Sequence, residues 1–389
     1  MIQNPLALIG VLLLIEIIVL FLANHPRSSK FFNILPSVFW IYFLPMLVSS
    51  FGLIDSHAAI YSKITTYILP MALFLLLMTV DIKAIFRLGA PALMMFFIGS
   101  LGIMLGMVIV FALFKNIVGS QMAGGFAALS GSWTGGSANM IAVKEALAVP
   151  ENVFLPMVIV DTIVPYVWMA IMIACVSLAP RVDQFNRADR KLLDDLNQRI
   201  KGVSTIKVKK LNVPVVVGLL SLACAGGLVS IYLSHCLPEI PGVITNYAWT
   251  IIVVSILGIV LSLTPVKKLE AYGTNKVGYF LLYFVLTSIG ARASIAHIGS
   301  AFILIAAGFL VVLIHAVILL VAAKLLRAPL FLAVVASQAN VGGVASAPVV
   351  AEIYQKGFAS VGLLLAILGN IEGTWIGIAV GQILHFFAQ

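Results

Sequence analysis

The residues best suited to reversible binding lie in two short stretches, each centred on a Gly-Gly pair. Gly135-Gly136 and Gly342-Gly343 are both flanked by hydroxyl and amide side chains. Oxygens of these types, with carbonyls freed near the glycines, are ligands suited to Na⁺, and N–H groups at the start of a helical arm attract anions. The alternative is that small polar residues mediate tight helix packing in lipid. The residues predicted to bind substrate are Ser132, Thr134, Gly135, Gly136, Ser137, Asn139, Gln338, Asn340, Gly342 and Gly343, and those predicted to bind a cation in these stretches are Ser130 and Ser337.

Three further polar residues interrupt apolar runs. Asp161 lies some ten residues into the run 152–179, where an ionisable side chain costs roughly 2.5–3.5 kcal/mol. At a shift of 209 positions it corresponds to Asn370 in the run 360–387, and Glu372 follows two residues later. One acid and one amide at related depths suit a monovalent cation. Asp161, Asn370 and Glu372 are therefore predicted cation-binding residues, and proton carriage by the acids is the alternative.

The remaining charged residues inside or beside apolar runs have structural interpretations. Glu16 interrupts the first run without polar neighbours and is interpreted as a scaffold or interface residue. Glu145 and Glu352 are expected to cap helix ends or to pair with Lys144 or Lys356. Arg292 follows a short run and is either an interfacial anchor or a partner for a substrate carboxylate.

The composition requires that most of the surface faces lipid. Hydrophobic residues make up 62% of the 389 positions and charged residues 10%, whereas a soluble protein carries about a quarter charged residues. The apolar runs are about 20 residues long, which is the length that crosses a bilayer core. The net charge of +9 does not indicate a nucleic-acid partner, because nine of the 23 basic residues lie in 181–210 and most others flank apolar runs.

The apolar elements form two sets of six on either side of a polar connector, 180–211. At a shift of 207 positions Ser130 matches Ser337, Gly135-Gly136 match Gly342-Gly343, and Glu145 matches Glu352. We therefore predict a first repeat, 1–179, and a second, 212–389. The expected elements are 6–24, 33–53, 61–80, 92–114, 120–147, 152–179, 212–234, 247–264, 276–291, 299–323, 329–355 and 360–387.

The segments 120–147 and 329–355 are predicted to enter the membrane and return as hairpins. Each arm has about 12 residues, or about 18 Å of helix, and so reaches only the midplane. With the connector in the cytoplasm, this topology places 19 of the 23 basic residues on the cytoplasmic side, whereas full crossings move several outside. The prediction is an all-α integral membrane protein of about ten transmembrane helices plus two re-entrant hairpins, with an inverted repeat and both termini outside.

The string Ser-Trp-Thr-Gly-Gly-Ser-Ala-Asn at 132–139 and the paired Gly-Gly motifs resemble the YjcL-like family of multispanning bacterial membrane proteins, over nearly the whole chain. That family is grouped with cation/proton antiporters and sodium-coupled anion carriers. The resemblance implies a scaffold domain, a mobile transport domain that moves as an elevator, and a homodimer. In the carriers, Gly-Gly re-entrant segments form the site; here the Gly-Gly-x-Gly pattern of those carriers is absent.

The expected function is secondary active transport: Na⁺- or H⁺-coupled symport of a small, anionic organic solute across the bacterial inner membrane. The alternative is a cation/proton antiporter without an organic substrate. An intramembrane enzyme would need an Asp/Asp, Ser/His or His-rich set at membrane depth, and the sequence has none. We expect no cofactor beyond the coupling ion, no metal beyond a monovalent cation, and no nucleic-acid partner; the partners are the solute and the bilayer.

Overall fold

The computed structural model describes residues 1–26, 32, 37–189, 191–200, 212–239, 245–293 and 301–388. In these ranges the chain is helical, apart from turns and one isolated bridge between Ile2 and Ile54. The all-α prediction is confirmed for this part of the chain. The apolar sequence explains the helical structure, because within a bilayer only helices and closed barrels satisfy every backbone N–H and C=O group internally.

The helices gather into two compact units that do not follow the two halves of the sequence. Unit 1 comprises Met1–Thr79, Ala148–Thr162 and Lys207–Ala301, and unit 2 comprises Val80–Leu147, Ile163–Ile206 and Phe302–Gln389. Each unit therefore draws on both halves. The predicted repeats at 1–179 and 212–389 stay a prediction, and both predicted hairpins lie within unit 2.

Unit 1 is a bundle in which close helix contacts are made by glycine. In it α14 packs against α4 and α3, and α13 packs against α4 and α12. A Cβ on Gly258 of α13 would lie 2.7 Å from the Leu77 side chain. Its helices are α1 (Pro5–Asn24), α3 (Ser37–Ser50), α4 (Ile60–Met78), α12 (Val213–Ser234), α13 (Asn246–Ser262), the 3-10 segment η3 (Pro265–Tyr272) and α14 (Thr274–Arg292), with the start of α9 (Glu151–Ala174).

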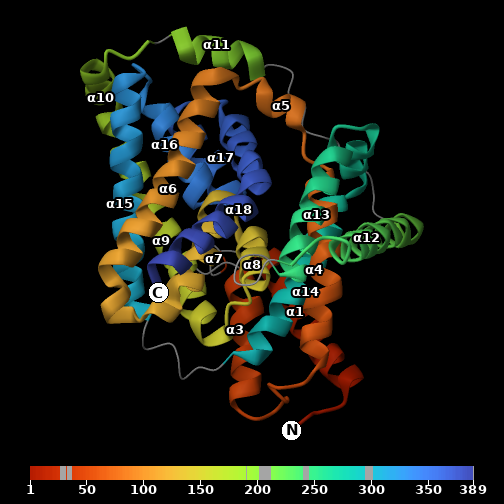
Figure 1. Cartoon of the computed structure of the whole chain (residues 1–389). Coiled ribbons are helices and arrows are strands. Elements are labelled where there is room, and N and C mark those ends of the chain that lie inside the picture. Colours follow the sequence, from red (N-terminus) through yellow and green to blue (C-terminus); the bar gives the residue numbers. More distant parts are fainter. Residues whose placement is uncertain are drawn as a thin grey trace. The chain divides into compact units, whose positions relative to one another are not determined.

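Unit 2 is built around α18, which contacts all four arms of the two hairpins and also α6 (Figure 1). Because α18 packs against both hairpins, it connects the first hairpin to the second. The helices of this unit are α5 (Ile82–Phe86), α6 (Gly89–Val118), α7 (Ala123–Gly135), α8 (Ser137–Ala146), the end of α9, α10 (Ala179–Asn186), α11 (Lys191–Ile200), α15 (Ala301–Leu325), α16 (Leu330–Val341), α17 (Gly343–Tyr354) and α18 (Ala359–Ala388).

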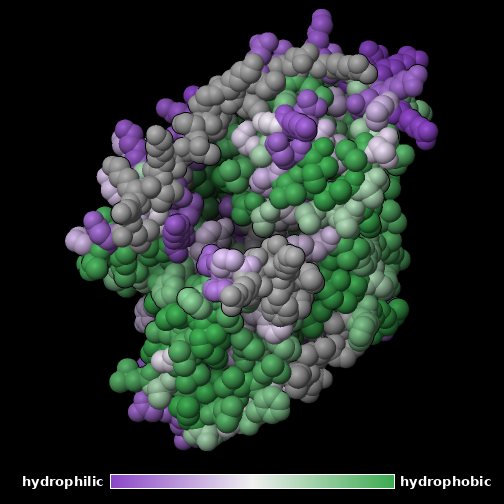
Figure 2. Space-filling model, turned by 180° about the vertical axis from the view of Figure 1, so that it is seen from behind, coloured by the Kyte–Doolittle hydropathy of each residue, from purple (hydrophilic) through white to green (hydrophobic). Residues whose placement is uncertain are grey.

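The outer faces of the helices are suited to lipid. On α6, an exposed stripe of Leu101, Leu105, Ile109 and Leu113 recurs every four residues, while Gly99, Gly102 and Gly106 are buried. Figure 2 shows broad hydrophobic surface and, at the top of the view, hydrophilic residues over α10 and α11. Seven described helices are long and apolar enough to span a membrane, or eight if α13 and η3 form one bent span.

The expected count of about ten spans is therefore not reached by length and composition within the described ranges. Three predicted spans account for the difference. The element at 33–53 is described as a helix only over Ser37–Ser50, α13 is short and followed by a 95° bend, and α14 is not among the qualifying helices. The count of ten stays a prediction.

Candidate functional site

The first broken segment is formed by α7 and α8, with Gly136 between them at φ +81°. This backbone conformation is readily adopted only by glycine. A Cβ on Gly131 would lie 2.9 Å from the Val143 side chain. Residues 12 positions apart on one straight helix would be separated by about 18 Å, so the chain turns back at Gly136. The break occurs at the predicted Gly-Gly pair, and the two arms pack against each other.

The second broken segment is formed by α16 and α17, with Gly343 at φ +62°. The Gln338 side-chain amide on α16 donates to the Ser346 hydroxyl on α17 at 2.7 Å, joining the two arms. A Cβ on Gly342 would overlap both of these side-chain atoms. The glycine pair therefore permits both the sharp turn and the polar bridge across it.

Glycines on α18 allow its backbone to touch the first hairpin directly. A Cβ on Gly369 would overlap the Thr134 carbonyl oxygen, and one on Gly373 would lie 2.6 Å from the Cα of Gly135. Small residues that bring two backbones together are a general device for helix association in lipid, where helix–helix contacts gain no hydrophobic driving force. The first break is thus held against the middle of α18.

Beside the first break, the Asn139 side chain connects α8 to α18. Its Nδ2 donates to the Gly135 carbonyl and, at 3.4 Å, to the Asn370 carbonyl, and its Oδ1 accepts from the Thr374 hydroxyl. The Asn370 Oδ1 atom lies 3.7 Å from the position a Cβ on Gly136 would take. Asn139 is buried, and all its hydrogen-bonding atoms have partners. Residues predicted to bind substrate (Gly135, Gly136 and Asn139) therefore lie beside Asn370, which is predicted to bind the cation.

On another side of α18, Glu372 is linked to the second hairpin through α6. The Ser100 hydroxyl donates to the Glu372 carboxylate, and the Asn340 Nδ2 donates to Ser100 Oγ at 2.9 Å. Ser100 is the one hydrogen-bond partner of Glu372 among the described residues. Asn370 and Glu372 are two positions apart, so they point to different sides of the helix. One helix thus presents an amide to the first break and an acid toward α6 and α16.

Two acceptors at the second hairpin are buried without a partner among the described residues. They are Gln338 Oε1 and Asn340 Oδ1, and both side chains are fully buried. An unpaired buried acceptor costs about 1–3 kcal/mol, so such atoms in a folded protein call for an explanation. An amide oxygen can accept a hydrogen bond from a donor group or coordinate a cation.

Sequence comparison gives the chain a family. Residues 10–387 match the family described as "Protein of unknown function (DUF819)". The chain belongs to the DUF819 family. The uncharacterized membrane protein YjcL of Bacillus subtilis (strain 168) is 25% identical over 355 residues, which cover 87% of each chain. The resemblance to the YjcL-like family is confirmed, as is a membrane protein with several spans.

Other predicted residues of the DUF819 protein are already engaged or lie elsewhere. The hydroxyls of Ser130 and Thr134 donate back along α7 to the carbonyls of Ala127 and Ser130, at 2.7 and 2.8 Å. Both side chains are fully buried, and their roles as ligands stay predictions. Asp161 lies in unit 1, whereas Asn370 and Glu372 lie in unit 2. Its predicted partnership with Asn370 also stays a prediction.

Two of the charged residues with structural interpretations form ion pairs in the DUF819 protein. Lys144 Nζ lies 2.6 Å from Glu145 Oε1, which confirms that pair. Arg292 lies 2.8 Å from Glu151 Oε1 in unit 1. This ion pair gives the guanidinium a carboxylate partner within the protein. In the described part of the chain, no group of three or more His, Cys, Asp or Glu residues is placed to hold a metal.

Sequence reasoning missed two hydrogen-bonding residues of this DUF819 protein next to the predicted Ser337. Trp168 Nε1 donates to Ser337 Oγ at 2.9 Å, and His315 Nε2 lies 2.9 Å from the same oxygen. His315 Nδ1 lies 2.8 Å from the Gly99 carbonyl, which can only accept. A neutral imidazole with its proton on Nδ1 satisfies every partner, since the Ser337 hydroxyl then donates to Nε2. His315 therefore acts as a structural bridge between α6, α15 and α16.

Proposed function

We propose that this protein is a secondary active transporter that couples Na⁺ or H⁺ to the symport of a small, anionic organic solute. The observation that carries the proposal is the presence of two interrupted helix pairs in one unit, both packed on α18 and both lined by predicted polar residues. Interrupted segments in corresponding halves of a membrane protein are the best sequence pointer to a transporter's binding site. Non-helical backbone at membrane depth is tolerated only where it is buried in protein or lines a cavity.

The solute would bind where α8 and α17 begin. Ser137 and Gly343 are the first residues of these arms, and neither helix has a side-chain cap on its first N–H groups. Helix N-termini carry unsatisfied N–H groups and a partial positive charge, which favour an anion. Small polar side chains near each break supply further hydrogen bonds. This chemistry supports a small anion and leaves its identity open to screening.

The coupling ion would bind at the Glu372 carboxylate and at the unpaired amide oxygens of α16 described above. Among the described residues its carboxylate has a hydroxyl partner and no basic one, so a monovalent cation or a proton would balance its charge. The same observation favours the second candidate, a cation/proton antiporter without an organic substrate. The two functions differ in one respect, because only the symporter needs a solute for net flux.

Transport would proceed by movement of unit 2 as one body. Both breaks, α18 and the polar residues around them belong to this unit, so such a movement would carry a bound solute without taking the site apart. Unit 1 would then serve as the scaffold and the homodimer contact. In this proposal the protein is a multi-pass protein of the bacterial inner membrane, with both termini outside.

The test combines ligand-induced stabilisation with flux and uses Glu372→Gln. Thermal unfolding of the purified protein is followed with Na⁺, Li⁺ and K⁺, each with panels of organic acids, amino acids and short peptides. A ligand at a hundredfold excess over its Kd adds about 2.7 kcal/mol of stability. We expect a cation-dependent shift of Tm with one class of solute, and cation-driven uptake of that solute in proteoliposomes.

The matched control is Glu16→Gln, which changes a fully buried acid on α1 of unit 1. We expect Glu372→Gln to abolish the cation-dependent shift and uptake, and Glu16→Gln to retain both. A shift with cations alone, together with cation-driven proton flux in the absence of solute, would establish the antiporter instead. Retention of full cation dependence by Glu372→Gln would overturn the assignment of the ion to this residue.

A further inference from the structure

The polar connector between the two sequence halves is not a plain loop, because its helices α10 and α11 fold onto unit 2. Helix α16 follows Pro329, whose side chain offers no acceptor for the first N–H groups of the helix. Asp183 of α10 fills this role, since its Oδ1 accepts from the Leu330 backbone N–H at 2.7 Å. A carboxylate at a helix N-terminus also interacts favourably with the helix dipole. The connector thus caps an arm of the second hairpin 147 residues away.

More contacts join the end of α10 to the corner between α15 and α16. Lys324 Nζ lies 3.7 Å from the centre of the Phe185 ring and donates to the Phe185 carbonyl. The backbone N–H of Asp189 donates to the Arg327 carbonyl at 3.0 Å. A cation above an aromatic face and a backbone hydrogen bond act on the same corner. The turn between α15 and α16 is therefore held by residues at the end of α10 and just after it.

The backbone at this joint is held in an unfavourable conformation on both sides. Arg187 has φ +51° and Arg327 has φ +50°, and they are two of the three non-glycine residues with positive φ in the described part of the chain. Non-glycine residues adopt this region at a cost, which persists only where surrounding contacts fix the conformation. The contacts around Arg187 and Arg327 therefore hold this joint in one defined conformation.

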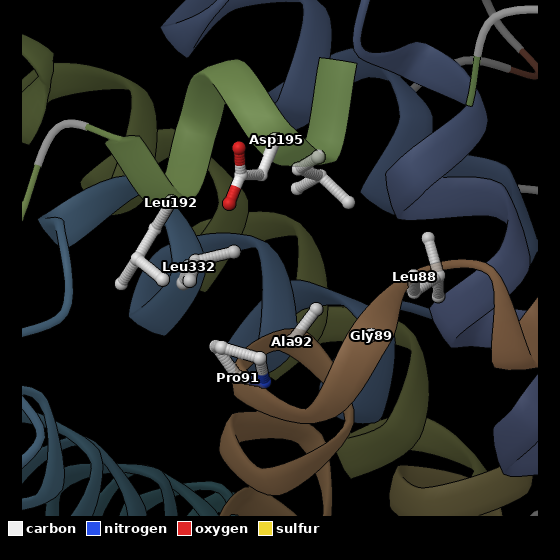
Figure 3. Close-up of a pocket in the computed structure, with 8 residues that line it drawn as sticks. Leu88, Gly89, Pro91, Ala92, Leu192, Asp195 and Leu332 are labelled. Atoms are coloured by element: carbon white, nitrogen blue, oxygen red, sulfur yellow. The ribbon is translucent and has the colours of Figure 1, made fainter. Parts of the chain in front are cut away.

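Helix α11 extends the contact to the start of α6. Leu196 is 3% exposed, and in Figure 3 the labelled Leu192 and Asp195 of α11 lie over Pro91 and Ala92 of α6 and Leu332 of α16. These residues, with Leu88 and Gly89, line a small hollow. The connector therefore contacts the first turn of α16 and shares a hollow with the first turn of α6.

Those two helices carry the polar contact that leads to Glu372. Ser100 lies 11 residues from the start of α6 and Asn340 lies 10 residues from the start of α16, which places them about 16 and 15 Å along their helices. Asn340 Nδ2 donates to Ser100 Oγ at 2.9 Å. Because both helices start at the connector and their polar residues meet at the same depth, a constraint on their first turns also constrains this contact.

We propose that α10 and α11 form a clamp that sets the spacing of α6 and α16, and that Asp183 is a positioning residue for Asn340 and the second break. The clamp caps α16 at its first N–H group, and its buried Leu196 faces the start of α6 in the shared hollow. Its effect on transport rests on the proposed function, whereas its effect on the order of the two helices does not.

Hydrogen–deuterium exchange of the full-length protein, without any solute, tests the clamp directly. In Asp183→Ala we expect exchange to become about fivefold faster in 330–333, which is the scale of losing one helix cap. We expect the same acceleration in 336–342, which contains Asn340 and the break. In Asp183→Asn, whose amide oxygen can still accept the hydrogen bond, exchange should match the parent protein.

The matched control is Asn212→Ala, which removes a comparable cap from α12, where Asn212 Oδ1 accepts from the Val215 N–H at 3.1 Å. It should leave 336–342 unchanged. Leu196→Ala provides a second route if Asp183→Ala does not fold, and it should accelerate exchange in 89–100 and in 336–342. Acceleration confined to the first turn of the altered helix would overturn the clamp. Since no solute is present, a failed transport assay would count against the proposed function alone.

Discussion

The two hairpins of unit 2 share a design but differ in how their polar groups are satisfied. At the first break, the Asn139 side chain donates a hydrogen bond through Nδ2 and accepts one at Oδ1. Glycines there bring α18 into backbone contact with α7. At the second break, Gln338 and Asn340 each keep a buried oxygen without a partner in the described structure. The difference is that the Asn139 amide of the first hairpin is fully paired, whereas two amide oxygens of the second hairpin have no partner in the described structure.

The largest expected effect is on the backbone contact of the first hairpin. Gly369→Ala would place a methyl group against the Thr134 carbonyl oxygen, and neither backbone can move away easily. We expect a loss of about 3 kcal/mol of stability or failure to fold, which is the upper range for overpacking. Thermal unfolding in detergent measures the effect.

The matched control for this change is Gly218→Ala in α12, where an added Cβ would have no atom within 4 Å. Alanine is favoured over glycine in a helix by up to about 1 kcal/mol, so this variant should be as stable as the parent or slightly more so. Equal tolerance of alanine at both positions would contradict the tight contact.

An intermediate effect should separate the two asparagines. Asn139→Ala removes an amide whose donor and acceptor are both used, so we expect a loss of about 2 kcal/mol of stability. Asn340→Ala removes an amide with an unpaired oxygen, so we expect a loss of only about 1 kcal/mol, together with about tenfold weaker binding of the coupling ion. Thermal unfolding with and without the ion measures both quantities. The reverse ranking in stability would remove the distinction between the hairpins.

The smallest expected effect concerns Ser337 in α16. Trp168→Phe removes one donor, while the hydroxyl keeps its bond to His315. We expect a loss of about 1 kcal/mol and no change in the affinity for the ion, because His315 still fixes the hydroxyl. Binding that weakens as much as in Asn340→Ala would show that Ser337 takes part in binding.

Regular patterns in the sequence predicted much of the local structure. The two breaks occur at Gly136 and at Gly342-Gly343, where small polar residues replace the apolar pattern. Gly102 and Gly106 of α6 lie against His315 and Val311 of α15, as small residues in an apolar helix commonly do at helix contacts. These features could be predicted because each depends on residues within one helix.

Contacts between distant helices could not be predicted in the same way. Ser100 is a single hydroxyl in an apolar helix, and its partners come 240 and 272 positions later. An isolated hydroxyl of this kind usually bonds within its own helix, so nothing local distinguishes Ser100 from a packing residue. The polar connector 180–211 carries no motif that indicates a cap, yet Asp183 caps α16.

The glycines of α18 also have a mechanical consequence. Gly369, Gly373, Gly377 and Gly381 recur every four residues, and the first three meet the backbone of α7. At a direct backbone contact, no flexible side chain lies between the two helices that could adjust to a small displacement of one along the other. The next equivalent fit lies four residues away, or about 6 Å along the helix. The first hairpin and α18 are therefore kept in register by backbone contacts, so a shift of one helix along its axis requires a matching shift of the other.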